Sequence, residues 1–431
     1  MENNFIGELK WRGLIQDITP ETNDQLNIES TTGYIGFDPT SDSLHIGSLV
    51  QIIILMHFQK YGHKPIALIG GATGMIGDPS GKSEERNLLD LKTLEKNIVG
   101  LKNQLEKFLD FNYKSKNAAK VLNNYDWIKN YTLIDFSRDI GKHITVNYMM
   151  SKDSVKTRIS SNSKQGMSFT EFTYQLLQGY DFLNLYEKYD CKLQMGGSDQ
   201  WGNITTGIEL VRRKLNSKAY AITCPLITKV DGSKFGKTEE GNIWLDKSKT
   251  SPYKFYQYWL NSSDIDAEKY IRIFTFLSKN EIISLVKEHR NQPHLRILQK
   301  KIAQELTLMV HSRQDLDNVE EASKILFGSS TSKDLNEIDE KTFFEIFEGV
   351  PLKEITLEKI NNGISMIEAF SSCTNFLNSN AEARRALNEN SISVNKVKVS
   401  EEYVIGKKDL INKNYILLQK GKKQYFIIKV K

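Results

Sequence analysis

The chain has 431 residues, of which 39% are hydrophobic and 10% aromatic, which indicates a folded globular protein of two or three domains. Its 58 Lys and Arg residues barely outnumber its 53 Asp and Glu residues, so the net charge is +5. Three scattered cysteines argue against a disulfide framework or a zinc site, and no apolar run approaches the ~20 residues of a membrane span. The first residues lack the layout of a secretory signal, so we expect a cytoplasmic protein.

The first half of the chain is expected to alternate strands and helices. We predict a strand at 33–37, a helix at 44–61 capped by Ser43, and a buried strand at 65–69 that ends in the glycine-rich stretch 70–81. Further elements follow as helices at 91–110, 169–189 and 204–215 and a strand at 192–196. This order is typical of an α/β fold with a Rossmann-like parallel sheet, whose ligands bind beyond the carboxyl ends of the strands.

The second half is expected to be helical and then mixed. After Pro252 the pattern is helical to about Phe327, and the next residues indicate a linker at 328–332 and a polar helical connector at 333–362. Residues 363–431 hold 12 Lys and Arg but 6 Asp and Glu, a modest sign of nucleic acid binding, although a lysine-rich solvated surface is an equally open interpretation. The expected domains are 1–250, 251–327, a linker and connector at 328–362, and 363–431.

Two short motifs far apart in the chain form its most informative pair. Residues 45–48 (HIGS) place an imidazole at the start of a helix, and residues 234–238 (KFGKT) place Lys234 and Lys237 in a loop rich in Gly, Ser and Thr. Cations and helix N-termini stabilise the shifting charge of a reacting polyphosphate. Each motif alone is weak, since most lysine-rich loops are merely solvated, but the ordered pair predicts such a ligand.

A helix with a polar stripe is predicted to follow a capping box at Ser168 and Glu171. Tyr174, Gln178 and Asp181 recur on one face of this helix, which is otherwise apolar nearly all round. Such a helix is buried, so its polar stripe must find hydrogen-bond partners. Either a structural network or a small polar ligand could supply them.

Two glycine-rich loops follow predicted strands. Residues 70–83 suggest a P-loop, but the spacing of their last glycines leaves one residue too few. The glycines still let the backbone approach a ligand, with Lys82 and Arg86 as nearby cations. In the second loop, 194–203, Asp199 could accept hydrogen bonds from a ribose or could equally be a turn carboxylate.

With these segments the chain resembles the bacterial-type tyrosyl-tRNA synthetases, which are class I aminoacyl-tRNA synthetases, from about Gly33 onward. The resemblance is most specific at 33–48, 67–86, 168–183, 193–205 and 231–238. The tail, with EARRAL at 382–387 and Val394-Asn395, is similar to a small RNA-binding domain shared with a ribosomal small-subunit protein. The resemblance implies a Rossmann-like catalytic domain with a mobile KFGKT loop, an α-helical anticodon-binding domain and a small α+β RNA-binding domain, in a homodimer.

The resemblance also implies roles for individual residues. The phenol hydroxyl of tyrosine would meet Tyr34 and Asp181, and the rest of the amino acid would meet Asp78, Tyr174, Gln178 and Gln200. ATP would meet Asp38, Thr40, His45, Gly47, Asp199, Lys234 and Lys237. Catalysis would rest on Thr40, His45, Lys82, Arg86, Lys234 and Lys237, which stabilise the phosphates as pyrophosphate leaves. RNA would meet Arg384, Arg385, Lys396 and Lys398.

The implied reaction activates tyrosine with ATP and moves it to the 3′ end of tRNA(Tyr). Mg²⁺ would come with ATP, and we expect no dedicated protein metal site. Two positions depart from the family pattern: Ser48 stands where a second His or an Asn is usual, and Ile35 stands where Cys is frequent. We therefore expect activity with an altered affinity for ATP.

Three alternatives remain open. A tryptophanyl-specific relative would share the fold, but Tyr34 and Asp181 argue against an indole pocket. A small nucleotidyltransferase would share the first motif but would not need a basic tail. A catalytically silent RNA-binding paralogue is suggested by Ser48. Pyrophosphate exchange with each amino acid would distinguish these cases.

Overall fold

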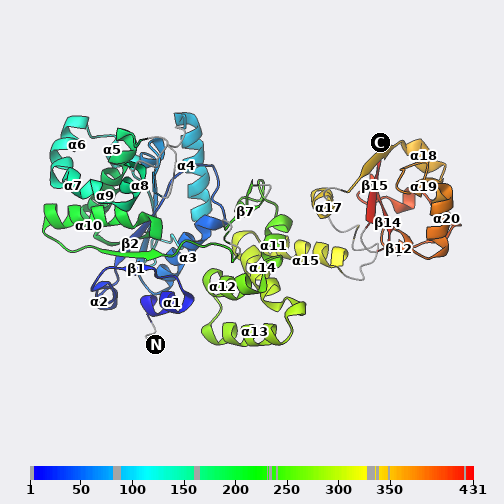
Figure 1. Ribbon diagram of the computed structural model, residues 1–431, viewed down its shortest axis with the longest axis horizontal. Helices are drawn as coiled ribbons and strands as arrows, with labels where there is room; N and C mark the ends of the chain where they lie inside the picture. Colours follow the sequence, from blue (N-terminus) through cyan, green and yellow to red (C-terminus); the bar gives the residue numbers. More distant parts are fainter. Residues whose placement is uncertain are drawn as a thin grey trace. The chain divides into compact units, whose positions relative to one another are not determined.

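The computed structural model describes residues 4–80, 89–159, 166–230, 232, 235–238, 241–327, 335, 339–347, 350–421 and 424–431 (Figure 1). The chain divides into two compact units, Met1–Thr250 with Leu260–Leu306, and Ser251–Trp259 with Thr307–Lys431. The predicted four-part division of the chain stays a prediction. In the described part of the chain, no helix is both long and apolar enough to cross a membrane. Cys191, Cys224 and Cys373 are buried free thiols.

The first unit is built on a six-stranded sheet in the order β1-β6-β5-β2-β3-β4. Its strands are β1 (Asp17–Ile18), β2 (Thr32–Phe37), β3 (Lys64–Ile69), β4 (Lys120–Asn123), β5 (Cys191–Gly197) and β6 (Tyr220–Cys224). All run parallel except β1, which pairs antiparallel with β6 at one edge. The predicted Rossmann-like parallel sheet is confirmed. Since parallel strands end at the same edge, Phe37, Ile69 and Gly197 bring their following loops together.

Helix α3 (Ile46–Lys60) begins later than the sequence predicts. Its N-cap is His45, whose ring Nδ1 accepts a hydrogen bond from the backbone N–H of Gly47 at 3.0 Å. The prediction of Ser43 as the cap is wrong, because the Ser43 hydroxyl is occupied by the amide of Gln104, which donates to it at 2.9 Å. The prediction that the imidazole lies at the start of a helix is confirmed.

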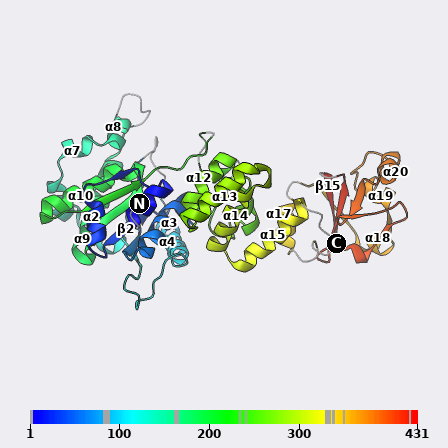
Figure 2. The same cartoon turned by 90° about the horizontal axis from the view of Figure 1, so that it is seen from below.

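Helix α9 (Phe169–Tyr189) has the predicted bounds and begins with the predicted capping box between Ser168 and Glu171. It lies side by side with α10 (Trp201–Leu215) (Figures 1 and 2). The stripe that ends at Asp181 is turned into the protein, where the Asp181 side chain is buried. The helix therefore carries polar groups into the interior next to the parallel sheet.

Further helices and a hairpin complete the first unit. The remaining helices are α1 (Phe5–Arg12), α2 (Thr22–Ile28), α4 (Leu91–Leu105), α5 (Tyr125–Ile128), α6 (Leu133–Asp139), α7 (Val146–Met150), α8 (Asp153–Ile159), α12 (Asp264–Phe274), α13 (Lys279–Asn291) and the first part of α14 (Ile297–Val310). A two-stranded hairpin joins β7 (Lys237–Thr238) to β8 (Gly241–Asn242).

The end of α12 is held by a buried arginine from the first helix. The guanidinium of Arg12 donates to the carbonyl oxygens of Arg272, Thr275 and Leu277 at 2.5, 2.6 and 2.9 Å. Glu8 balances its charge at 2.7 Å, and the Arg12 side chain is only 1% exposed. Because the last carbonyls of a helix lack partners within the helix, Arg12 acts as a side-chain cap for α12.

The second unit contains a five-stranded sheet in the order β12-β11-β14-β15-β9. Its strands are β9 (Leu352–Ile355), β11 (Ile392–Val394), β12 (Val397–Lys398), β14 (Tyr415–Lys420) and β15 (Gln424–Val430), and β10 (Ile364–Ser365) pairs separately with β13 (Val404–Ile405). Its helices are α11 (Pro252–Leu260, except its last residue), α15 (Arg313–Phe327), α17 (Glu340–Ile346), α18 (Leu357–Asn361), α19 (Met366–Phe370) and α20 (Asn380–Asn388), with the end of α14.

The predicted α+β character of the tail is confirmed, but the helical connector is wrong at 352–355. These residues form β9, which lies parallel to β15 with Ile355 opposite Val430. Four residues are too few for periodicity to separate a strand from a helix turn, so the pairing with the distant strand decides. The predicted linker at 328–332 lies outside the described residues.

Candidate functional site

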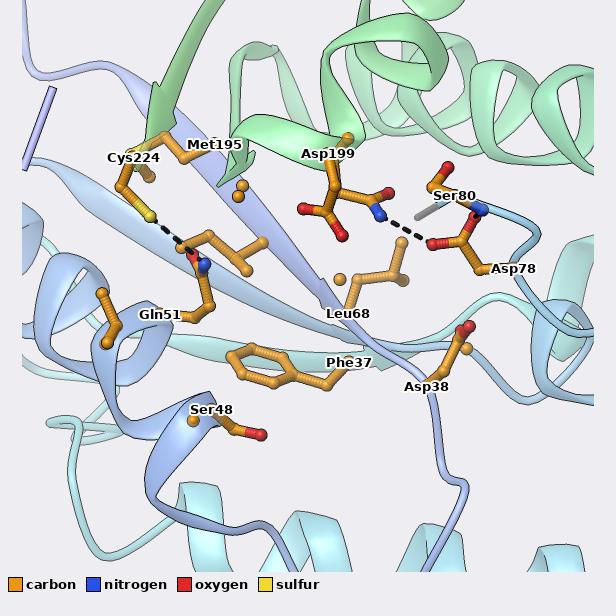
Figure 3. Close-up of a pocket in the computed structure, with 18 of the residues that line it drawn as sticks. Phe37, Asp38, Ser48, Gln51, Leu68, Asp78, Ser80, Met195, Asp199 and Cys224 are labelled. Carbon is orange, nitrogen blue, oxygen red and sulfur yellow. Dashed lines mark hydrogen bonds between the residues drawn. The ribbon is translucent and has the colours of Figure 1, made fainter. Parts of the chain in front are cut away.

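A cavity of about 630 Å³ opens beyond the carboxyl ends of β2, β3 and β5. The start of α3, one face of α9 and the loops after β5 and β6 complete its wall. The predicted site residues that line it are Tyr34, Asp38, His45, Gly47, Asp78, Tyr174, Gln178, Asp181, Asp199 and Gln200. In Figure 3, Ser48, Gln51 and Cys224 lie on one side and Asp78 and Ser80 on the opposite side.

A buried hydroxyl and a buried carboxyl group form the most enclosed polar part of the cavity. Tyr34 is 1% exposed, and its hydroxyl oxygen finds no hydrogen-bond partner among the described residues. The Asp181 carboxylate accepts from Asn124 Nδ2 at 2.9 Å and from Trp127 Nε1 at 2.8 Å. An unpaired buried hydroxyl costs free energy, so Tyr34 points to a ligand that carries a hydroxyl group.

Burial changes the acid–base properties of this pair. It raises the pKa of Asp181 to about 7, although the hydrogen bonds from Asn124 and Trp127 act in the opposite direction. Burial also raises the pKa of Tyr34 far above its usual value, and the nearby charge of Asp181 adds to the rise. Tyr34 is therefore a neutral hydroxyl, while Asp181 changes its charge near neutral pH.

A second cluster gathers hydrogen-bond acceptors around Asp78. Its Oδ2 accepts from Gln200 Nε2 at 2.6 Å, and its Oδ1 accepts from the backbone N–H of Ser80 at 3.0 Å. Asn203 Nδ2 donates to Gln178 Oε1 at 3.0 Å, which fixes this amide with its oxygen beside the carboxylate. A carboxylate and amide oxygens with capacity left suit an ammonium group, which has three donors and no acceptor.

Asp38 links the clusters. The Tyr174 hydroxyl donates to Asp38 Oδ2 at 3.0 Å, and the Thr73 hydroxyl donates to Oδ1 at 2.9 Å. Asn124 Nδ2 also donates to Thr73 Oγ1 at 3.1 Å, so one amide joins Asp38 to Asp181 through Thr73. Gly70 allows this packing, because a Cβ there would lie 2.1 Å from Asp38 Oδ1.

The other end of the cavity is formed by the N-terminus of α3. Gly47 and Ser48 line it, and the His45 ring folds over Gly47, where a Cβ would lie 2.7 Å from the ring Cε1. The first N–H groups of the helix are already used: that of Ile46 donates to the Ile243 carbonyl oxygen at 3.0 Å, that of Gly47 to the His45 ring at 3.0 Å and that of Ser48 to the His45 carbonyl oxygen at 2.9 Å. The imidazole and the helix dipole therefore act on a ligand here without relying on a free N–H of these three residues. A helix N-terminus beside an imidazole is suited to anionic groups such as phosphates.

Sequence reasoning missed Gln51 and Cys224 on this side of the cavity. Gln51 follows Ser48 by one helical turn and lines the cavity with it (Figure 3). Its Nε2 donates to Cys224 Sγ at 3.4 Å, whereas its Oε1 is buried without a partner in the described part of the chain. The i, i+3 spacing after Ser48 was the available signal.

Asn124, Trp127 and Asn203 were also missed. Asn124 and Trp127 follow β4, a strand that the sequence analysis did not predict because Lys120–Asn123 shows only a weak apolar pattern. Asn203 is one turn after Asp199 in α10, whose start was predicted three residues too late. A better placement of α10 would have indicated Asn203, whereas Asn124 and Trp127 depend on contacts with the distant Asp181.

Some predicted site residues are not brought to the cavity by the described structure. Thr40 is exposed and absent from the cavity wall, and its backbone N–H donates to the Asp38 carbonyl oxygen at 2.9 Å. Lys82, Arg86 and Lys234 lie outside the described residues. Lys237 is described only as part of strand β7.

The predicted RNA-binding residues lie in the second unit. Arg384 and Arg385 are exposed on α20, and Arg384 pairs with Glu401 at 3.5 Å. Lys396 Nζ donates to the Tyr425 hydroxyl at 2.7 Å, and Lys398 donates to a backbone carbonyl oxygen at 2.6 Å.

Comparison with known proteins gives matches along the chain. Residues 27–328 match the family "tRNA synthetases class I (W and Y)", and residues 342–428 match the "Tyrosine--tRNA ligase SYY-like C-terminal domain". The chain is 63% identical over 430 residues to a tyrosine–tRNA ligase of Flavobacterium psychrophilum, covering 99% of this chain and 100% of the relative. It is 58% identical over 426 residues to one of Porphyromonas gingivalis, with 99% of each covered.

A solved structure is also similar. It is a C-terminally truncated mitochondrial tyrosyl-tRNA synthetase from Aspergillus nidulans, with a TM-score of 0.68 and 29% sequence identity. The similarity covers 76% of this chain and 95% of that chain.

Proposed function

Because the chain belongs to the class I tRNA synthetases and, within them, to the tyrosine–tRNA ligases, we propose how its own residues carry out the reaction. The enzyme first joins a carboxylate oxygen of L-tyrosine to the α-phosphorus of ATP, and the bond to the β-phosphate breaks to release pyrophosphate. A ribose hydroxyl at the 3′ end of tRNA(Tyr) then takes the tyrosyl group, and AMP leaves. No side chain needs to become a covalent nucleophile, since positioning and charge stabilisation suffice.

The single observation that carries the substrate assignment is the 63% identity to a tyrosine–tRNA ligase over the whole chain. The family match at 27–328 removes the nucleotidyltransferase alternative, but it covers tryptophan and tyrosine enzymes alike. The tyrosine-specific match at 342–428 and the full-length tyrosine–tRNA ligase relative argue against a tryptophanyl enzyme. Within the cavity, the unpaired Tyr34 hydroxyl beside Asp181 supports the same choice, because a phenol hydroxyl can bond to both.

The remaining contacts of tyrosine are placed by the acceptors around Asp78. Asp78, Tyr174 and Gln178 receive the ammonium group, and Gln200 holds Asp78 in position through its 2.6 Å hydrogen bond. Tyr174 is itself held by Asp38. This arrangement leaves the tyrosine carboxylate directed away from the buried phenol pocket.

ATP is placed at the α3 end of the cavity. His45 and the N-terminus of α3 at Gly47 meet phosphate oxygens, Asp38 lines the space between the substrates, and Asp199 meets the ribose. Gln51 adds an unpaired acceptor for a nucleoside hydroxyl or amino group, at a site where Ile35 offers no hydrogen bond. Thr40, Lys82, Arg86, Lys234 and Lys237 complete the phosphate contacts by family resemblance.

The partners and the metal ion are also proposals. Within the described ranges, no group of three or more His, Cys, Asp and Glu side chains could hold a metal ion. We propose that Mg²⁺ arrives with ATP, whose phosphates supply its oxygen ligands. We propose a homodimer, which would cover apolar side chains that are exposed in one chain: Leu133, Ile134, Val146 and Phe169. The helical part at 251–327 would contact the anticodon, and the basic tail with Arg384, Arg385, Lys396 and Lys398 would contact tRNA phosphates, in the cytoplasm.

Replacing His45 or Lys237 with Ala is expected to slow adenylate formation by about 10²-fold and to leave tyrosine affinity nearly unchanged. Both residues act on phosphate charge that grows in the transition state. ATP–pyrophosphate exchange measures the rate, and equilibrium binding measures tyrosine affinity. Lys247→Ala, which removes an exposed lysine outside the cavity, is the matched control. Weaker tyrosine binding with an unchanged chemical step would contradict these roles.

Tyrosine affinity is expected to rise from about pH 6 to about pH 8 and then to level off. Burial raises the pKa of Asp181 to about 7 in the free enzyme, so below that pH a proton occupies the group that should accept the phenol hydroxyl. Tyrosine must then displace this proton, at a cost of up to about tenfold in affinity per pH unit.

Binding measurements across this pH range, with two variants, test the linkage. Asp181→Asn should bind tyrosine weakly and with little pH dependence. Asp199→Asn keeps the dependence, because its carboxylate lines the cavity but faces the nucleotide in our assignment. A wild-type affinity that stays constant across the range would show that Asp181 does not accept the hydroxyl.

A further inference from the structure

Phe235, inside the KFGKT motif, packs its ring into an aromatic cluster on α12. Its ring centroid lies 5.3 Å from that of Phe274 with an interplanar angle of 19°, and 5.3 Å from that of Tyr270 with an angle of 60°. Tyr270 and Phe274 also contact each other at 5.8 Å, and both are buried. Aromatic pairs at these separations are favourable beyond the area they bury, so the ring is a specific attachment point.

The residues that lead into the motif are attached to the same helix. The backbone N–H of Val230 donates to Asp266 Oδ1 at 3.1 Å, and Lys269 Nζ lies 3.5 Å from the Thr228 carbonyl oxygen. Thr228 and Phe235 both line the cavity. Helix α12 therefore contacts this stretch of chain at more than one residue on its way past the cavity.

The residues after Phe235 are attached to the start of α3. The carbonyl oxygen of Gly236 accepts from the backbone N–H of Ile243 at 3.1 Å, and the carbonyl oxygen of Ile243 accepts from the N–H of Ile46 at 3.0 Å. Gly236 has a φ of +81°, and a Cβ there would lie 3.0 Å from Ile46 Cγ1. The backbone thus passes directly against the residue that follows His45.

We propose that Phe235 is a positioning residue for adenylate formation. Its ring fixes the KFGKT backbone to α12, so that β7, which carries Lys237, is held beside the His45 end of α3. The inference rests on the proposed role of Lys237 in the chemical step. Phe235 itself contacts neither reacting group. It acts by holding the KFGKT motif in a fixed position relative to the HIGS motif on the other side of the cavity.

Removal of the ring tests the proposal in the full-length enzyme. Phe235→Ala is expected to lower the turnover number of tyrosine-dependent ATP–pyrophosphate exchange by roughly 10- to 100-fold, since small displacements of a catalytic group carry penalties of this size. Tyrosine affinity and the melting temperature should stay at wild-type values. Phe235→Tyr should restore most of the rate and Phe235→Leu only part of it. Val230→Ala is the matched control, because its side chain is exposed and its backbone bond to Asp266 remains.

A double-mutant cycle separates loss of the contact between Phe235 and α12 from a general disturbance of the fold. Tyr270→Leu should slow exchange in the wild type and much less in the Phe235→Ala background, because the contact is already lost there. Additive effects would overturn the proposal. It would also be overturned if Phe235→Ala matched Val230→Ala in turnover, or if tyrosine affinity fell as much as turnover.

Lys237→Ala, measured in parallel, separates a failure of the proposed role of Phe235 from a failure of the proposed role of Lys237. A slow Lys237→Ala enzyme with a fast Phe235→Ala enzyme refutes the role of Phe235 and leaves the proposed function intact. A fast Lys237→Ala enzyme removes the phosphate role of this lysine and, with it, the premise on which the role of Phe235 depends.

Discussion

Phenylalanine is expected to support pyrophosphate exchange at least ~10⁴-fold less efficiently than tyrosine; tyrosine-specific synthetases are themselves the standard example of such rejection. The Tyr34 hydroxyl has no partner in the described structure, and Asp181 lies close enough for its charge to raise the pKa of Tyr34. Phenylalanine would leave the Tyr34 hydroxyl buried without a partner and would give Asp181 no donor beyond Asn124 and Trp127, a penalty that an apolar pocket cannot impose for a similar difference in size. The ratio of kcat/KM values for the two amino acids measures this effect.

Tyr34→Phe provides the matched variant for this experiment, because it removes one oxygen atom and keeps the ring packed against Phe182. The variant should lose part of the discrimination, mainly through weaker use of tyrosine. Comparable pyrophosphate exchange with both amino acids in the wild type would contradict the assignment of the phenol pocket.

Truncation after Phe327 is expected to separate the two half-reactions. Every residue proposed for adenylate formation precedes residue 239, so the shortened chain should still form tyrosyl-adenylate. It should charge tRNA poorly, because the basic tail is lost. If all four proposed basic residues contact phosphates, the slope of the logarithm of tRNA affinity against the logarithm of salt concentration should become shallower by roughly three.

The matched control is a full-length chain in which Arg384, Arg385, Lys396 and Lys398 are replaced by Gln. It should reproduce the shallower salt dependence while the tail remains folded, since its buried core residues are untouched. Charging at the wild-type rate by the truncated chain would contradict the tRNA role of the tail. Loss of adenylate formation would show that the first part does not function without it.

The elements that could be predicted from sequence are those with a long and continuous pattern. Helix α9 combines a capping box at Ser168 with a long apolar run that carries one polar stripe, and its predicted bounds agree with the structure. The start of α3 could not be placed in this way, because Ser43 and His45 are both able to cap a helix and a contact with the distant Gln104 occupies Ser43. Strand β9 depends equally on a remote partner, β15.

The site residues differ in the same way: some could be predicted from their place next to a strand, and others depend on contacts with distant residues. Polar residues after predicted strands, such as Asp38, could be assigned to one cavity because parallel strands end at a common edge. The particular roles came from family resemblance and remain proposals. Asn124 and Trp127 could not be found, because their importance lies in hydrogen bonds to Asp181 on a helix more than 50 residues away. The spacing of Gln51 after Ser48 placed it on the same helix face, but its oxygen without a partner among the described residues could be seen only in the structure.

The buried guanidinium of Arg12 connects the first helix, α1, to the helix that holds Phe235 beside the proposed ATP site. Arg12 ties helix α1 to the carbonyl of Arg272 in the last turn of α12 and to those of Thr275 and Leu277 just after it, and α12 in turn holds Phe235. A fusion, a cleavage or a substitution that shifts α1 would therefore leave three carbonyl groups, that of Thr275 buried, without their donor and weaken the hold on the end of α12. Such damage would be recorded as slow catalysis in a protein that still binds tyrosine, and the terminal helix would be easily overlooked as its source.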